Sequence, residues 1–138
     1  MKRNILGPLL LLALSLVACA TTSRKRSPEQ KRTEVLTTLM EQHGGQSEHS
    51  LRYNPTICPC PPFEVLLGTR WARVVLVADT ADEKAVVELT ERARKEHERS
   101  PSKLYQVRGS LDDSSVGVCG PSFPVIDLEL LGVVPDGP

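Results

Sequence analysis

The chain has 138 residues, and its 17 basic and 17 acidic side chains give a formal net charge of +0 at pH 7. Only 4% of its residues are aromatic. This composition offers no electrostatic case for nucleic-acid binding, and we expect no nucleic-acid partner. The length suits one small domain with an N-terminal tether.

Residues 1–18 have the pattern of an export signal. Lys2 and Arg3 form a short positive segment, and an apolar run follows from residue 5 to residue 18. This run is shorter than the roughly 20 apolar residues that a membrane-spanning helix needs, and it suits the apolar core of a signal peptide. We therefore predict a signal peptide over residues 1–18.

The apolar run ends in Leu16-Val17-Ala18-Cys19, which resembles the lipobox of bacterial lipoproteins. The resemblance implies cleavage before Cys19 and acylation of its sulfur and amino groups, with membrane lipid as the partner. Each buried CH₂ contributes about 0.8 kcal/mol, so several acyl chains would hold the protein firmly. Ala20 stands where an aspartate often marks inner-membrane retention in that family, which favours the outer membrane. The resemblance thus implies a lipid-anchored protein of the bacterial cell envelope that faces the periplasm; an ordinary secretory signal or an uncleaved anchor helix is the alternative.

Residues 19–27, from the lipidated cysteine onward, are predicted to form a basic tether. Basic residues beside a lipid anchor can contribute about 1 kcal/mol each at an anionic leaflet, although a solvated tether is the simpler interpretation. Residues 28–52 are predicted to form a short helix and a loop. Ser27 and Pro28 are typical of a helix start, and Gly44 is typical of its end.

Residues 53–138 are predicted to form a single α+β domain. Two strands over residues 63–68 and 70–79 should form a hairpin, since only a short turn separates them. A helix should follow, with Thr80 and Glu83 as a capping box, and end near Ser100. Two further strands are expected over residues 104–111 and 123–134, with a loop between them that carries Cys119.

The element order of strand, strand, helix, strand, strand predicts an α+β fold with one main helix between strand pairs, preceded by the short N-terminal helix. It resembles an OB-like barrel, in which a helix commonly lies between the third and fourth strands. The resemblance concerns element order alone. A two-layer sandwich built on a small antiparallel sheet is the alternative.

Three cysteines remain once Cys19 is acylated, and export would place them in an oxidising compartment where disulfides persist. Cysteines at i and i+2, such as Cys58 and Cys60, seldom form a disulfide with each other, because an extended backbone does not bring their sulfur atoms together. We expect a disulfide between either Cys58 or Cys60 and Cys119, with one thiol left over. Such a bridge contributes about 4 kcal/mol at most.

A metal site is the main alternative for these sulfurs. Three thiolates could bind Zn²⁺ or Cu(I), but the spacing of Cys58 and Cys60 is not the usual zinc pattern. The candidate ligands are the thiolates of Cys58, Cys60 and Cys119, joined by one of the histidines His43, His49 and His97. Thiol–disulfide exchange with a partner is a further possibility for the cysteine pair or the spare thiol.

The sequence holds no nucleophile elbow, phosphate-binding glycine loop or haem motif, and we predict a non-enzyme without a cofactor. A binding or structural role follows, with an envelope protein as a possible partner. If the barrel is OB-like, Arg73 and Arg108 on its exposed face and the loop over residues 112–122 are the candidate ligand-binding positions.

Overall fold

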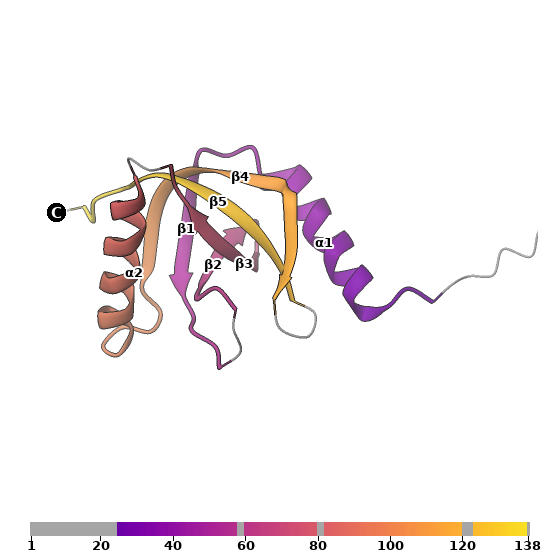
Figure 1. The fold of residues 1–138 in the computed structure, drawn as a ribbon, viewed down its shortest axis with the longest axis horizontal. Coiled ribbons are helices and arrows are strands. Elements are labelled where there is room, and N and C mark those ends of the chain that lie inside the picture. Colours follow the sequence, from indigo (N-terminus) through magenta and orange to yellow (C-terminus); the bar gives the residue numbers. More distant parts are fainter. Residues whose placement is uncertain (1–24, 58–59, 80–81, 120–122, 138) are drawn as a thin grey trace, which may run out of the picture.

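The computed structural model describes residues 25–57, 60–79, 82–119 and 123–137, except for the side chains of residues 113–118 and 123 (Figure 1). Its elements are α1 (Pro28–His43), β1 (Glu48–Tyr53), β2 (Phe63–Leu67), β3 (Arg70–Val77), α2 (Glu83–His97), β4 (Leu104–Cys119) and β5 (Phe123–Val133). The predicted signal peptide, Cys19, Cys58 and Thr80 lie outside the described residues. Neither of the two helices in the described part of the chain is long and apolar enough to span a membrane.

The five strands form a closed barrel in the order β1-β2-β3-β5-β4, and β4 pairs with β1 to close it. Neighbouring strands are antiparallel except for β3 and β5, which are parallel. Together with the position of α2 between β3 and β4, this topology is OB-like. The α+β prediction is therefore confirmed. The alternative of a small antiparallel sheet in a two-layer sandwich is wrong, because the sheet is mixed and closes on itself.

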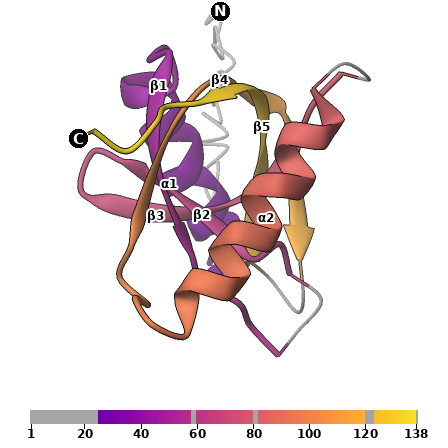
Figure 2. The ribbon, with the colours of Figure 1, turned by 90° about the vertical axis from the view of Figure 1, so that its left-hand side faces the viewer.

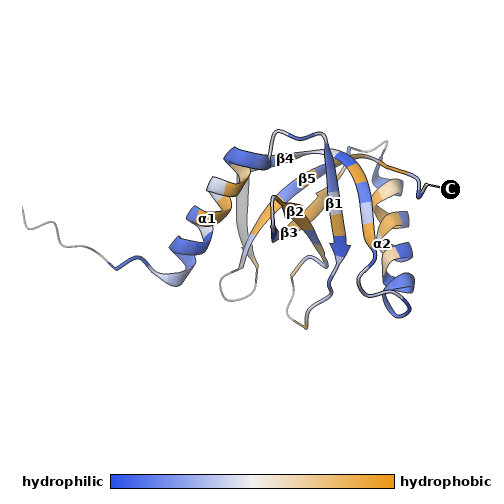
Figure 3. Cartoon of the chain, turned by 180° about the vertical axis from the view of Figure 1, so that it is seen from behind, coloured by the Kyte–Doolittle hydropathy of each residue, from blue (hydrophilic) through white to orange (hydrophobic). Residues whose placement is uncertain are grey.

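The core fills the barrel, and one helix covers each end. Alternate strand residues point inward, and Leu51, Val65, Val74, Val107 and Leu128 are each 0% exposed. The two helices add apolar side chains at opposite ends, Leu36 and Met40 from α1 and Leu89 and Ala93 from α2 (Figures 1 and 2). Hydrophilic residues cover much of the outer surface of both helices (Figure 3).

The segment predicted as a loop after α1 is in fact a strand. Its residues alternate, with His49 and Leu51 buried and Ser50 and Arg52 more exposed. This strand, β1, pairs with β2 on one side and β4 on the other. The barrel therefore begins at Glu48, and the predicted domain start at residue 53 omitted one of its strands.

The predicted β2–β3 hairpin is confirmed, with Leu67 paired to Arg70 around Gly68, whose φ is +60°. Helix α2 begins at Glu83 with Asp82 as N-cap, and the Asp82 side chain makes no capping hydrogen bond. The predicted capping box would need Glu83 at the third helical position, but Glu83 is the first residue of α2, so this prediction is wrong.

The predicted loop after residue 111 is also wrong, because β4 continues to Cys119. The β4–β5 pairing shifts register between Asp112 and Gly117 and then resumes as far as Cys119 and Phe123. A local irregularity of this kind lets a strand bend without ending the sheet. The polar run in this part of the sequence therefore lies within a strand.

Candidate functional site

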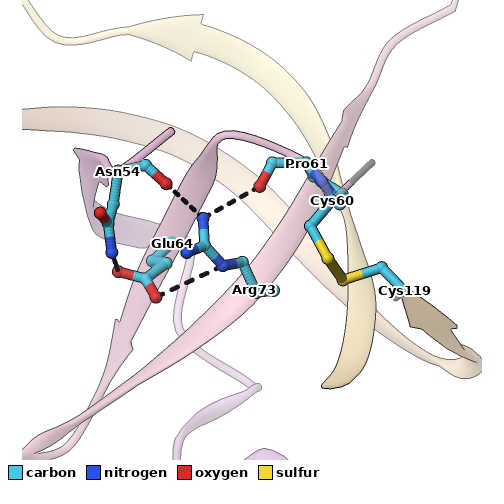
Figure 4. The surroundings of a disulfide bond; sticks show 6 residues. All are labelled: Asn54, Cys60, Pro61, Glu64, Arg73 and Cys119. Atoms are coloured by element: carbon cyan, nitrogen blue, oxygen red, sulfur yellow. Dashed lines mark hydrogen bonds and ion pairs between the residues drawn. A yellow bond between two sulfur atoms is a disulfide. The ribbon is translucent and has the colours of Figure 1, made fainter. Parts of the chain in front are cut away.

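The β1–β2 loop, residues 54–62, is closed at its base and covalently joined to β4. The backbone N–H of Asn54 donates to the carbonyl of Pro62 at 2.7 Å. Within the loop, Cys60 forms a disulfide with Cys119, with a Cα–Cα distance of 5.2 Å (Figure 4). Cys119 is the last residue of β4, so this bond links the β1–β2 loop to the end of β4. The predicted disulfide staple is present, and Cys60 is the partner.

Arg73 of β3 holds the same loop from the barrel side. Its Nη1 donates to the carbonyl of Asn54 at 2.5 Å and to the carbonyl of Pro61 at 3.1 Å (Figure 4). These carbonyls lie near the two ends of the loop. One guanidinium therefore braces the loop at both ends, and the disulfide fixes it beside Pro61.

Glu64 of β2 lies between two arginines on the outer face of the barrel. It is paired across the sheet with Arg52 of β1 and with Arg73 of β3. Its carboxylate lies 2.5 Å from Arg52 Nε and 3.5 Å from Arg73 Nε, and it also accepts from Asn54 Nδ2 at 3.0 Å. The carboxylate thus fixes two guanidinium groups and is itself 12% exposed.

A groove of about 310 Å³ lies between α1 and the outer face of β2 and β3. Its lining includes Lys31, Arg32, Val35, Leu39, Arg70 and Trp71. Trp71 lies against the Arg52 guanidinium, with 4.4 Å between the guanidinium carbon and the ring centroid. This groove was not predicted from the sequence. Its available signal was Trp71, the single tryptophan of the chain, set on the outward face of a strand.

A second depression, of about 440 Å³, is lined by carboxylates from the neighbouring strands β4 and β5 and from Asp79, which follows β3. Asp112 and Asp127 lie opposite each other in the β4–β5 pair, and Ser110 donates to Glu129 at 3.3 Å. None of the described residues that line it is Lys or Arg. The depression therefore gives the barrel an acidic side, away from the groove beside α1.

The two arginines predicted as ligand-binding residues do not come together. Arg73 lies beside Val125 of β5, whereas Arg108 of β4 lies beside Gly132. These positions on β5 are separated by roughly 20 Å at the usual rise of a strand. The Arg73 guanidinium is occupied by Glu64 and the loop carbonyls, while Arg108 is exposed. A single small ligand could not contact both.

The geometry does not support the metal-handling alternative. Cys60 and Cys119 form a disulfide, so neither offers a thiolate ligand. The described residues contain no group of three or more His, Cys, Asp or Glu side chains arranged to hold a metal ion. Cys58, the third sulfur of that alternative, lies outside the described residues.

Comparisons with known proteins do not assign the chain to a family. No family model matches the sequence, and neither the curated proteins nor the solved structures give a match. The function is therefore inferred from the residues and geometry of the chain itself.

Proposed function

We propose that this chain is a lipid-anchored protein of the bacterial cell envelope, and that its barrel is a binding or structural module facing the periplasm. The Leu16–Cys19 motif supports the anchor. The Cys60–Cys119 disulfide is the observation that carries the proposal, because structural disulfides persist in exported proteins and are rare in reducing compartments. We place the protein at the outer membrane in preference to the inner.

The position of the disulfide supports a binding role. OB-like barrels bind ligands at the face of their second and third strands and at the loops that join strands 1–2 and 4–5. In this chain the disulfide joins the β1–β2 loop to the last residue of β4, and Arg73 braces the same loop. Loops fixed in advance lose less conformational entropy when a partner binds. The argument is one of fold-level analogy, and the ligand is not defined by it.

The anchor is tested by labelling the full chain with radioactive palmitate in a bacterial host. We expect the wild-type protein to carry label and to fractionate with membranes. Cys19→Ala should remove both properties, while the control Cys58→Ala should retain both. An unlabelled wild-type protein in the soluble fraction would refute the lipid anchor.

The non-enzymatic part of the proposal is tested separately, with purified protein and a panel of ester, peptide and glycan substrates. We expect no turnover above that of the reduced, unfolded protein. Saturable hydrolysis of any substrate class would refute this part and leave the anchor unaffected.

A further inference from the structure

The groove beside α1 combines an apolar floor with basic edges. Val35 of α1 lines the groove and is 44% exposed. Leu39 and Trp71 extend this apolar surface. Tryptophan is a residue favoured at membrane–water interfaces, because its ring is apolar and its N–H is polar.

The charges that border the groove are mainly positive. Among the described residues, its lining contains four cationic side chains and one carboxylate, that of Glu64. Glu64 forms ion pairs with Arg52 and Arg73, and the other basic side chains of the lining are Lys31, Arg32 and Arg70. The groove is therefore complementary to an anionic surface.

Among the described residues that line this groove, none is an acidic residue of α1. Lys31, Val35 and Leu39 follow one another at intervals of four and so share one side of the helix. Glu29 and Glu34 line a different depression on α1, and Glu34 pairs with Arg26 at 2.6 Å. The side of α1 that borders the groove therefore presents basic and apolar residues together.

The proposed anchor places this surface close to a membrane. Residues 20–27 connect Cys19 to α1, and eight extended residues span at most roughly 28 Å. Lys31 and Arg32 lie in the first turns of α1, immediately after this tether. Acylation of Cys19 would therefore hold the groove within reach of lipid headgroups.

We propose that the groove bordered by Lys31, Arg32 and Arg70 docks on the anionic lipid headgroups of the membrane that holds the anchor, with Val35 and Trp71 at the interface. This inference deepens the proposed function, and it depends on that function for the proximity of the membrane. Docking would give the barrel a fixed orientation, with α1 toward the lipid and α2 at the far end, since the two helices cover opposite ends (Figure 1).

The experiment uses unlipidated residues 20–138. Among the described residues, the buried hydrophobic side chains all lie between Leu36 and Leu130, so we expect this chain to fold. Vesicles of phosphatidylcholine, with or without phosphatidylglycerol, are titrated while Trp71 emission is recorded. We expect a blue shift with the anionic vesicles alone, and quenching by lipids brominated on their acyl chains. Added salt should reverse both effects.

The groove variant replaces Lys31, Arg32 and Arg70 by glutamine. It should lower the vesicle partition coefficient at least about 10-fold, because each basic residue near an anionic surface contributes to the binding free energy. The matched control, Lys84→Gln/Lys95→Gln/Arg99→Gln, removes the same charge at the α2 end and should change partition less than about twofold. These control residues are all exposed.

Equal losses in the two variants would show that net charge, and not the groove, controls binding, and would overturn the inference. Wild-type protein whose Trp71 emission is unchanged by anionic vesicles would overturn it as well, without reliance on any variant. The vesicle experiment uses protein without an acyl chain, so it does not test the anchor. Palmitate labelling of Cys19 tests the anchor independently, and the two proposals can therefore fail separately.

Discussion

Glu64 and Arg73 face each other across β2 and β3, and their side chains form an ion pair of 3.5 Å in which each is 12% exposed. The same arginine reaches the carbonyls of Asn54 and Pro61, which flank the disulfide-bonded part of the loop. A charge pair on the barrel wall thereby determines where the β1–β2 loop lies.

Replacement of Glu64 by glutamine should destabilise the domain. It leaves two guanidinium groups without their carboxylate, and Arg73 is too buried to be compensated by water. Loss of one partner of a buried ion pair costs about 3–5 kcal/mol of folding stability. Because Arg52 is partly exposed, we expect the free energy of unfolding to fall by about 2–4 kcal/mol. Urea denaturation of oxidised protein measures the change.

The control for this variant is Glu48→Gln, on the neighbouring strand β1 and exposed to solvent. Its free energy of unfolding should lie within about 0.5 kcal/mol of the wild-type value. Equal effects of the two substitutions would show that Glu64 does not organise the loop.

The disulfide should contribute substantially to stability. Cys119→Ser removes the bridge, which spans a sequence separation of 59, and should lower the free energy of unfolding by about 2–4 kcal/mol. Reduction of the wild-type protein should give a similar loss. Cys58→Ser should preserve the bridge, and non-reducing peptide mapping will show whether Cys60 remains paired. A stable Cys58–Cys119 bridge in the wild-type protein would contradict the assignment.

Stability should fall as the pH is lowered through the range in which His49 titrates. Burial lowers the pKa of His49 below its ordinary value of 6.5, and this effect exceeds the opposing one of backbone hydrogen bonds with Gln46 and Gly109. The unfolded chain therefore takes up a proton near pH 6.5 that the folded chain takes up only at lower pH. The stabilisation is present above about pH 6.5 and is lost as the pH falls toward the folded pKa.

Urea denaturation between about pH 7.5 and pH 5 tests this dependence, with His49→Leu as the comparison. The pKa values of Glu91 and Glu96 are lowered from 4.5, chiefly by side-chain hydrogen bonds with Arg94 and Tyr105 respectively, so these groups titrate below the window. We expect a smaller slope in the variant. An unchanged slope would mean that His49 protonates with equal ease in both states.

Gly68→Ala should destabilise the β2–β3 turn. Gly68 has a φ of +60°, and an added Cβ would lie 2.6 Å from Nε2 of His43 in α1. The left-handed conformation alone costs a non-glycine residue about 1–2 kcal/mol. Gly45→Ala is the matched control, because a Cβ there meets nothing within 4 Å. Thermal unfolding of both variants should show a lower midpoint for Gly68→Ala alone.

The sequence was sufficient to predict the elements with strong apolar alternation. The hairpin around Gly68 and the strand β5 are of this kind. Strand β1 was missed because His49 and Ser50 make its sequence polar, although His49, Leu51 and Tyr53 keep the period of two. The signal was present, but an inward-facing histidine obscured it.

Other features depend on contacts that no local pattern contains. The parallel pairing of β3 with β5, and hence closure of the barrel, joins segments about 50 residues apart in sequence. The choice of Cys60 over Cys58 depends on the path of the β1–β2 loop, which Arg73 fixes from another strand. Arg73 could be singled out from the sequence as an exposed-face arginine. Its role in bracing the loop could not be predicted, because that role depends on tertiary contacts.

The most direct test of the proposed function is the mass of the full chain purified from bacterial membranes, with thiols alkylated before and after reduction. We predict an N-terminus at Cys19 that carries a diacylglyceryl group, a Cys60–Cys119 disulfide and a single free thiol at Cys58. A chain without acyl mass, or one with three free thiols, would contradict the proposal that this protein is a lipid-anchored, disulfide-stapled envelope module.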